Sequence, residues 1–141
     1  MNGRIVFPRF GLGADLAFLV DTGSDRTMLM PGDGLMLGLD YALLNGAAGI
    51  GRGVGGAVVT YTEPAWIVFS DGEQLFGYSI NLAILEYSAE MLGVPSILGR
   101  DLLHRWHLDY AFEHGQLTAE VLSADVAVSS SEKIAPRFVH E

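Results

Sequence analysis

An aspartate at the end of an apolar segment is the residue of this sequence best placed to do chemistry. The apolar run 18–20 continues directly into Asp21, Thr22, Gly23 and Ser24. A carboxylate at the end of a buried strand is costly unless it is paired or functional. The two hydroxyl groups can donate hydrogen bonds, and glycine lets backbone amides approach a carboxylate closely. We therefore expect Asp21 to be held in a fixed orientation as an acid or a base.

Two further segments follow this aspartate along the chain. Between Ala47 and Gly56 five of ten residues are glycine, a composition that favours a mobile hairpin. Later the apolar pair 97–98 is followed by Gly99, Arg100 and Asp101. The string Asp-Thr-Gly-Ser recurs by chance and also occurs in phosphate-binding loops, so the interpretation depends on all three segments in this order.

In this order the three segments resemble the retropepsin-like aspartic proteases. The pattern of that family is an apolar run with Asp-Thr-Gly-Ser or Asp-Thr-Gly-Ala, a glycine-rich flap, and an apolar pair with Gly-Arg-Asp or Gly-Arg-Asn. The matching residues are 21–24, 51–56 and 97–103, and the resemblance extends over residues 4–121. It implies an all-β, retropepsin-like fold, a closed barrel-like domain with one short C-terminal helix.

The resemblance also implies an aspartic endopeptidase that is active only as a homodimer. Pepsin-like enzymes carry two Asp-Thr-Gly copies in one chain, whereas this chain carries one, so two copies must associate. Two carboxylates a few ångströms apart cannot both ionise, and the pair shares one proton. One Asp21 would then act as base toward a water molecule, and its symmetry mate as acid toward the scissile carbonyl of a peptide.

By the same resemblance, the neighbouring residues have supporting roles. Thr22 would hydrogen bond across the dimer axis, and the amide of Gly23 would hold the carboxylates. Asp25 would form an ion pair with Arg100, which ties the loop that contains Ser24 to the helix after it. The alternative for this pair is an incidental surface contact that contributes little stability.

The tip of the expected flap is the most glycine-rich part of the sequence. There the missing side chains would let the backbone close over an extended peptide and hydrogen bond to it. The alternative is an ordinary flexible hairpin. The substrate-binding tip is expected at Gly53, Val54, Gly55 and Gly56.

Other charged or metal-ligating residues offer weaker sites. By the same resemblance, Arg4 would reach the region of the partner's Asp25, with Arg9 as the alternative. His104 and His107 are three residues apart on an expected helix, a spacing that can suit a metal. No Cys and no clear third ligand accompany them, so we expect no metal site and interpret them as surface or core residues.

Short strands separated by glycine-rich turns must position these residues. We expect the strand at 14–20 to be buried on both faces, including Leu19, and the last helix to pack through Leu102, Leu103 and Trp106. Expected strands lie at 5–7, 14–20, 27–30, 57–61, 65–69, 74–85, 108–112 and 116–122, with a helical turn at 39–44 and a helix at 100–107.

Length and composition bound the domain organisation. The chain has 141 residues, of which 50% are apolar, enough for the core of one domain. We expect this domain over residues 1–122. The remainder, 123–141, is more polar and is expected to be flexible or associated with the dimer.

Charge and motif content restrict the partners. Eight basic residues stand against 17 acidic ones, and the net charge is −9, so nucleic acids and anionic membranes are poor partners. The sequence has neither a signal peptide at its start nor a long apolar span, which together with the absence of Cys fits a cytoplasmic protein. No dinucleotide or Gly-Lys-Ser/Thr fingerprint occurs, and no cofactor is expected.

Two other functions remain open from the sequence. The first is a retropepsin-fold dimer that binds peptides or proteins without cutting them, although the intact residues 21–23 do not favour this. The second takes residues 21–24 as the phosphate-binding loop of an actin-like ATPase. The chain is too short for that two-lobed architecture, and no second nucleotide loop is evident.

Overall fold

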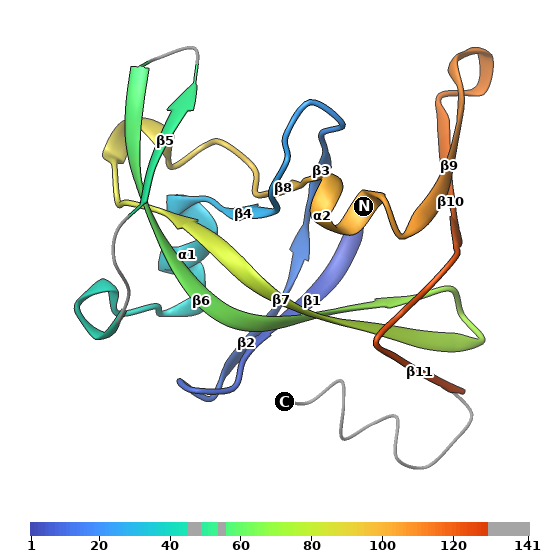
Figure 1. The fold of residues 1–141 in the computed structure, drawn as a ribbon, viewed down its shortest axis with the longest axis horizontal. Helices are drawn as coiled ribbons and strands as arrows, with labels where there is room; N and C mark the ends of the chain where they lie inside the picture. Colours follow the sequence, from blue (N-terminus) through green and yellow to red (C-terminus); the bar gives the residue numbers. More distant parts are fainter. Residues whose placement is uncertain (45–48, 54–55, 130–141) are drawn as a thin grey trace.

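Strands dominate the computed structural model, which describes residues 1–44, 49–53 and 56–129. Nine strands in this part of the chain form one sheet that curls as a partial barrel (Figure 1), so the all-β class is confirmed. The strands of this sheet are β1 (Asn2–Phe7), β2 (Leu12–Ala17), β3 (Leu19–Val20), β4 (Met28–Leu29), β5 (Gly49–Gly53), β6 (Gly56–Ser70), β7 (Gln74–Leu85), β8 (Ile97–Leu98) and β11 (Val126–Ser129). A separate two-stranded sheet contains β9 (Trp106–Ala111) and β10 (Gln116–Val121), and the two α-helices are α1 (Pro31–Leu37) and α2 (Arg100–Leu103).

The strand order brings distant segments of the chain together. It runs β2-β1-β6-β7-β4-β8-β3, with β5 paired to β6 and β11 paired to β7. The short strands β3 and β8 are parallel. Because both therefore end at the same edge, the residues that follow β3 lie beside the residues that follow β8.

A long hairpin of β6 and β7 forms the centre of the sheet. It is paired continuously from Thr60 and Leu85 to Ser70 and Leu75. We expected two separate strands at 57–61 and 65–69, and this was wrong. The exposed Pro64 lies inside the single strand β6, where its missing amide leaves the neighbouring ladder intact.

An aromatic cluster joins the last part of the chain to this hairpin. Phe69 and Trp106 meet edge to face with ring centroids 4.9 Å apart, a favourable arrangement. The indole Nε1 of Trp106 donates to the hydroxyl of Tyr78 at 2.7 Å, and that hydroxyl donates to the carbonyl of Ser123 at 2.9 Å. Both buried polar groups of the cluster are thus satisfied.

The helices differ from the expectation in two places. Helix α1 was not predicted, because Pro31 was interpreted only as the end of a strand, whereas proline also favours the first turn of a helix. Helix α2 ends at Leu103, not at residue 107, and Trp106 begins β9. Leu102, Leu103 and Trp106 are all buried as expected, because strand β9 turns the indole toward the same core.

The strand before the candidate catalytic residue is buried on one face only. Leu16 and Phe18 lie in the core, but Ala17 is exposed and the side chain of Leu19 is 53% exposed. The expectation of two buried faces was therefore wrong. Strand β3 is the last in the strand order, so its alternate residues face away from the core.

The described part of the tail lies against its own domain. Leu122 and Ser123 both donate backbone hydrogen bonds to the carbonyl of Arg105. Arg105 forms an ion pair with Asp125 at 2.9 Å, and β11 then pairs with β7. Residues 130–141 lie outside the described part of the chain, and the boundary at residue 122 stays a prediction.

Asp125 makes the stability of this tail dependent on pH. The backbone amide of Ser79, and secondly Arg105, bind its carboxylate and lower its pKa below the usual 3.8. Because the folded-state pKa is depressed, the stabilisation is present above that usual value and is lost as the pH falls through the folded-state pKa. We expect Asp125→Asn to lower the melting temperature by a few degrees near neutral pH and to leave it unchanged at a pH low enough to protonate Asp125 in the folded protein as well. Thermal unfolding at both pH values checks this, and Asp109→Asn on the exposed side of β9 is the control. An equal change in the melting temperature of Asp125→Asn at the two pH values would contradict the expectation.

Candidate active site

The carboxylate of Asp21 is held at the end of β3 by its own loop. The backbone amide of Asp21 donates to the carbonyl of Leu98 at 3.0 Å, which continues the pairing of β3 with β8. The amide of Ser24 closes the turn on the Asp21 carbonyl at 3.2 Å. The amide of Gly23 donates to Oδ1 of Asp21 at 3.0 Å. The half-buried carboxylate is therefore oriented by a backbone donor and still meets solvent.

The two motif segments pack backbone against backbone. A Cβ atom built on Gly99 would collide with the backbone carbonyl of Arg26. Only glycine permits this approach, since any side chain would separate the segments. The guanidinium of Arg26 in turn donates to the carbonyl of Asn81 at 3.2 Å, which connects the loop to β7.

A buried threonine connects the same two segments through its side chain. Thr27 is fully buried, and its hydroxyl donates to Oδ1 of Asp101 at 2.7 Å and accepts from the amide of Gly99 at 3.0 Å. The amide of Thr27 donates to the same carboxylate oxygen at 2.9 Å. Neither Thr27 nor the role of Asp101 was predicted. The only signal was Asp101 in the Gly-Arg-Asp string, whose partner lies 74 residues away.

Arg100 holds the loop in a different way from the one expected. Its guanidinium donates to the carbonyl of Thr22 at 2.9 Å, and its amide donates to the carbonyl of Ser24 at 2.8 Å. Among the described residues, no ion pair joins Arg100 to Asp25. The exposed side chain of Asp25 remains in solvent, and its carbonyl accepts from the amide of Asp101 at 3.2 Å. The expected ion pair was wrong within one chain, although Arg100 does support the loop.

A second polar group supports the start of β8. The hydroxyl of the buried Ser96 donates to Asp33 at 2.6 Å and accepts from the amide of Met30 at 2.9 Å. The carbonyl of Ser96 accepts from the amide of Leu19 at 2.9 Å. Helix α1, which contains Asp33, is thereby fastened to β8 directly before the candidate active site.

The glycine-rich hairpin is formed by β5 and the first part of β6. Its pairing extends from Gly49 and Thr60 to Gly53 and Gly56. Val54 and Gly55, which were also assigned to the expected tip, lie outside the described residues. In Figure 1 this hairpin, the loop between β3 and β4, and the β9–β10 hairpin extend toward the same side of the sheet.

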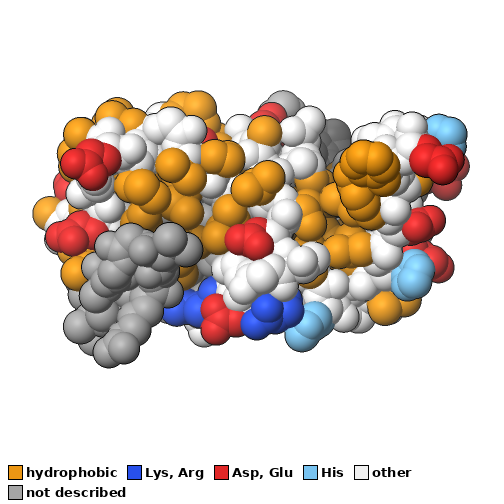
Figure 2. Space-filling view, turned by 90° about the horizontal axis from the view of Figure 1, so that it is seen from above, with side chains coloured by type: hydrophobic (Ala, Val, Ile, Leu, Met, Phe, Trp, Pro, Cys, Tyr) orange, Lys and Arg blue, Asp and Glu red, His pale blue; other side chains and the backbone are white. Residues whose placement is uncertain are grey.

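The face on that side is largely apolar and carries acidic groups. Figure 2 shows it from above, with hydrophobic side chains over much of its surface and acidic groups between them. Exposed large apolar residues flank both ends of the site, and include Leu19 next to the active loop and Phe112 at the tip of the β9–β10 hairpin. This surface suits an apolar partner better than a polyanion.

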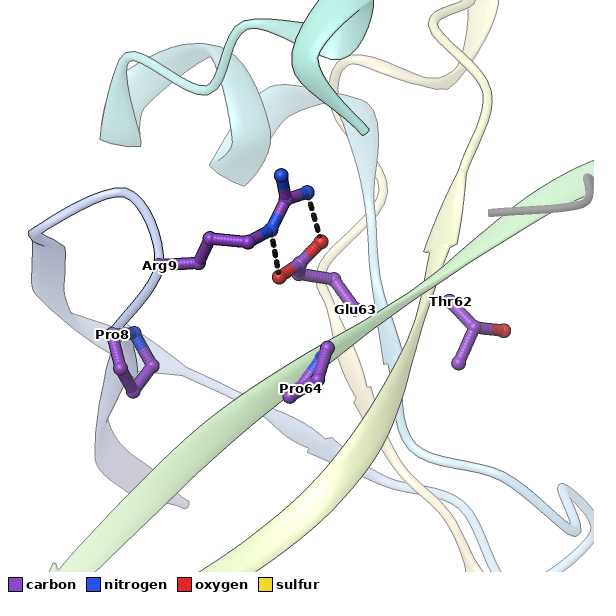
Figure 3. A pocket seen from close by; sticks show the side chains of 5 residues that line it. All are labelled: Pro8, Arg9, Thr62, Glu63 and Pro64. Atoms are coloured by element: carbon purple, nitrogen blue, oxygen red, sulfur yellow. Dashed lines mark hydrogen bonds and ion pairs between the residues drawn. The ribbon is translucent and has the colours of Figure 1, made fainter. Parts of the chain in front are cut away.

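The arginines proposed to reach a partner are engaged within the chain. Arg4 pairs with Asp15 at 3.2 Å across β1 and β2. Arg9 pairs with the buried Glu63 at 2.6 Å beside a cavity of about 350 Å³ (Figure 3). Both guanidinium groups are thus paired within the chain, and the expectation that one of them extends to the partner's Asp25 stays a prediction.

The two histidines do not share a helix face. His104 caps the end of α2, whereas His107 lies in β9. Over the residues that the structure describes, no cluster of three His, Cys, Asp or Glu side chains is arranged to bind a metal. A helix of sufficient length and apolarity to cross the bilayer is likewise missing from the described ranges.

Comparison with known proteins gives a similarity of fold. No protein-family model and no curated protein matches the sequence. Among solved structures, a retropepsin-like aspartic protease from Rickettsia conorii aligns at a TM-score of 0.53 with 20% identity, over 89% of this chain and 91% of that one. EIAV protease complexed with the inhibitor HBY-793 aligns at a TM-score of 0.46 with 24% identity, over 74% of this chain and 83% of that one. The first alignment spans nearly the whole described structure, and it identifies the fold of this chain as that of the retropepsin-like aspartic proteases.

Proposed function

We propose that the protein is an aspartic endopeptidase that works as a homodimer. The observation that carries this proposal is the solvent-facing carboxylate of Asp21, which the amide of Gly23 holds in place at 3.0 Å. A single oriented carboxylate lacks an acid partner in its own chain: among the described residues, none of the hydrogen bonds of Asp21 comes from a second titratable group. A second copy of the loop supplies that partner.

The proposed reaction needs one proton shared between two Asp21 carboxylates. The ionised carboxylate removes a proton from a bound water molecule, whose oxygen adds to the peptide carbonyl carbon. The protonated carboxyl gives its proton to the carbonyl oxygen, so that a tetrahedral diol forms without a covalent bond to the enzyme. The carboxyl that took the proton from water then donates it to the amide nitrogen, and the other carboxylate, now ionised, removes a proton from one hydroxyl of the diol as the C–N bond breaks. The amine and the new carboxylic acid leave, and the two Asp21 side chains again share one proton. The amide of Gly23 in each copy fixes the carboxylate during these transfers.

The β9–β10 hairpin supports self-association. In the described part of the chain it pairs with no further strand, which leaves its edges available. Large apolar side chains lie exposed along it, with Tyr110 64% exposed and Phe112 82% exposed. Leu117 and Leu122 add to this surface. We infer that this hairpin belongs to the dimer contact, because an apolar surface of this kind is usually covered by a partner.

The β5–β6 hairpin is proposed as the flap over the substrate. Its described backbone extends toward the same side as the Asp21 loop (Figure 1). An extended peptide between the hairpin and the two loops can add main-chain hydrogen bonds as a further strand would. The apolar surface around the site suits hydrophobic side chains of such a peptide.

Digestion of a diverse peptide library at several pH values tests the proposed function. We expect cleavage of internal peptide bonds that a pepstatin-type inhibitor blocks, because such inhibitors occupy the site of the tetrahedral intermediate. Peptide binding without any cleavage over the whole pH range would instead support a non-catalytic binding module. Absence of both binding and cleavage by the folded dimer would contradict both proposals.

A further inference from the structure

A buried carboxylate lies in the middle of the central strand β6. The side chain of Glu63 is only 2% exposed. Both of its oxygens accept from Arg9, one from Nε at 3.0 Å and one from Nη2 at 2.6 Å (Figure 3). Such a fork-shaped pair fixes the guanidinium plane as well as its distance. The hydrogen bond to Glu63 also raises the pKa of Arg9, so the guanidinium remains charged.

The same guanidinium makes a third contact with another part of the chain. Nη2 of Arg9 donates to the backbone carbonyl of Leu43 at 2.9 Å. Arg9 itself lies in the turn between β1 and β2, where its guanidinium carbon is 4.2 Å from the ring centre of Phe10. One side chain therefore joins three segments, the β1–β2 turn, strand β6 and the 3-10 helix Tyr41–Leu43.

Two of these segments border the proposed flap along the chain. The chain enters β5 after Leu43 and leaves the hairpin along β6, which contains Glu63. Strand β5 has no strand partner other than β6 among the described residues. Among the described residues the sheet therefore pairs with the hairpin through β6 alone. The segment before β5 is held against β6 by the bond from Arg9 to Leu43 and by the edge contact of Tyr41 with Tyr61, and Leu44 is buried in the core.

We propose that Arg9 is a positioning residue that sets the orientation of the β5–β6 hairpin over the active site by binding both strand β6 and the segment that precedes β5. The effect of this residue on substrate binding rests on the proposed function, whereas the anchoring of the hairpin does not depend on that function. A buried ion pair often contributes no more stability than an apolar pair of the same volume, so the distinctive effect of Arg9 is geometric. Its contact with Leu43 is what an apolar pair would not reproduce.

Amide hydrogen exchange of the folded protein tests the anchoring without any substrate. We expect Arg9→Met to accelerate exchange in β5 and the first part of β6 by about tenfold, while β1 and β7 keep their protection. Arg4→Met is the matched control, since Arg4 lies on the same β1–β2 hairpin and forms its ion pair with Asp15 within that hairpin. Unchanged exchange in the β5–β6 hairpin of Arg9→Met would overturn the proposal, as would equal acceleration in all strands.

A double variant covers the case in which Arg9→Met does not fold because Glu63 is left unpaired. Arg9→Met with Glu63→Met removes the buried charge together with its partner and is expected to fold. The bond to Leu43 is still missing, so β5 should exchange several times faster than in the unchanged protein. Wild-type protection of β5 in this double variant would contradict the positioning role.

Kinetics of Arg9→Lys separate a positioning role from a structural one. Lysine keeps the charge but loses the fork-shaped pair and the additional bond to Leu43. A misplaced flap weakens peptide binding, so KM should rise about threefold to tenfold at nearly constant kcat. A merely structural defect reduces the amount of active enzyme and lowers kcat at constant KM, which would overturn the proposal. If the protein cuts no peptide at all, the proposed function fails while the exchange result still stands.

Discussion

Replacing Asp21 with Asn is expected to abolish peptide hydrolysis. An amide can neither remove a proton from water nor donate one to the carbonyl, so both roles of the dyad are lost together. We expect kcat/KM to fall on the order of 10³-fold or more. The amide oxygen of Asn can still accept from the Gly23 amide, the bond that orients Asp21 at 3.0 Å, so fold and dimer should persist. Initial rates on a cleavable peptide, measured with the sedimentation profile of the variant, check both statements.

Asp15→Asn is the matched control for this experiment. Asp15 lies on β2, the strand that precedes β3 in the sequence, and its side chain is 78% exposed and pairs only with Arg4 among the described residues. An exposed pair contributes little, so the control should retain full activity. Residual hydrolysis by the Asp21 variant at the rate of the control would reject the assignment of Asp21.

Replacing Thr27 with Val is expected to have the largest effect on stability among substitutions that preserve side-chain size. The valine fills the same volume but leaves the amide of Gly99 without an acceptor and removes one donor from Asp101. A buried polar group without a partner costs about 1–3 kcal/mol. We expect the free energy of unfolding to fall by about this amount, and kcat/KM to fall with it because the two loop segments separate. Urea unfolding at a fixed protein concentration measures the first quantity.

Thr118→Val is the control that separates this effect from the change in residue type. Thr118 is exposed on β10, and its hydroxyl makes only a long bond of 3.4 Å to the carbonyl of Asp109. Valine suits an exposed strand position as well as threonine does. Equal unfolding free energies for the Thr27 and Thr118 variants would show that the network around Asp101 does not hold the loop.

The parts of the candidate site that could be predicted are those whose residues are consecutive in the sequence. The apolar strand, Asp21 and Gly23 are consecutive, and their order already implies an oriented carboxylate at a strand end. The strand β7 and the hairpin of β9 with β10 were predicted for the same reason, because alternation and turn residues lie within a few positions of each other. These predictions needed no contact between distant parts of the chain.

Other features depended on contacts that no local pattern reveals. Thr27 is an ordinary threonine in the sequence, and its role follows only from a partner 74 residues away. Arg100 was paired with Asp25 by the family resemblance, yet its guanidinium binds the carbonyl of Thr22, because backbone acceptors are as available as carboxylates. Sequence reasoning recognised that both segments meet, but not which atoms join them.

Secondary structure was missed where one residue suits two structures. Pro31 can end a strand or begin a helix, and the glycines beside it favoured the first interpretation. Trp106 has a spacing that fits both the end of a helix and the start of a strand. In each case packing against the sheet decides, and this packing is not encoded in a window of a few residues.

The central claim is that one active site contains the Asp21 carboxylates of two chains, and mixing experiments test it most directly. Unmodified and Asp21→Asn subunits are allowed to exchange at equal concentrations, and hydrolysis is measured at constant total protein. If both carboxylates are required, only dimers of two unmodified subunits are active. The rate then falls to about a quarter of the rate of the same total amount of unmodified protein. A rate of about half, proportional to the unmodified subunits, would mean that each chain works alone and would contradict the account.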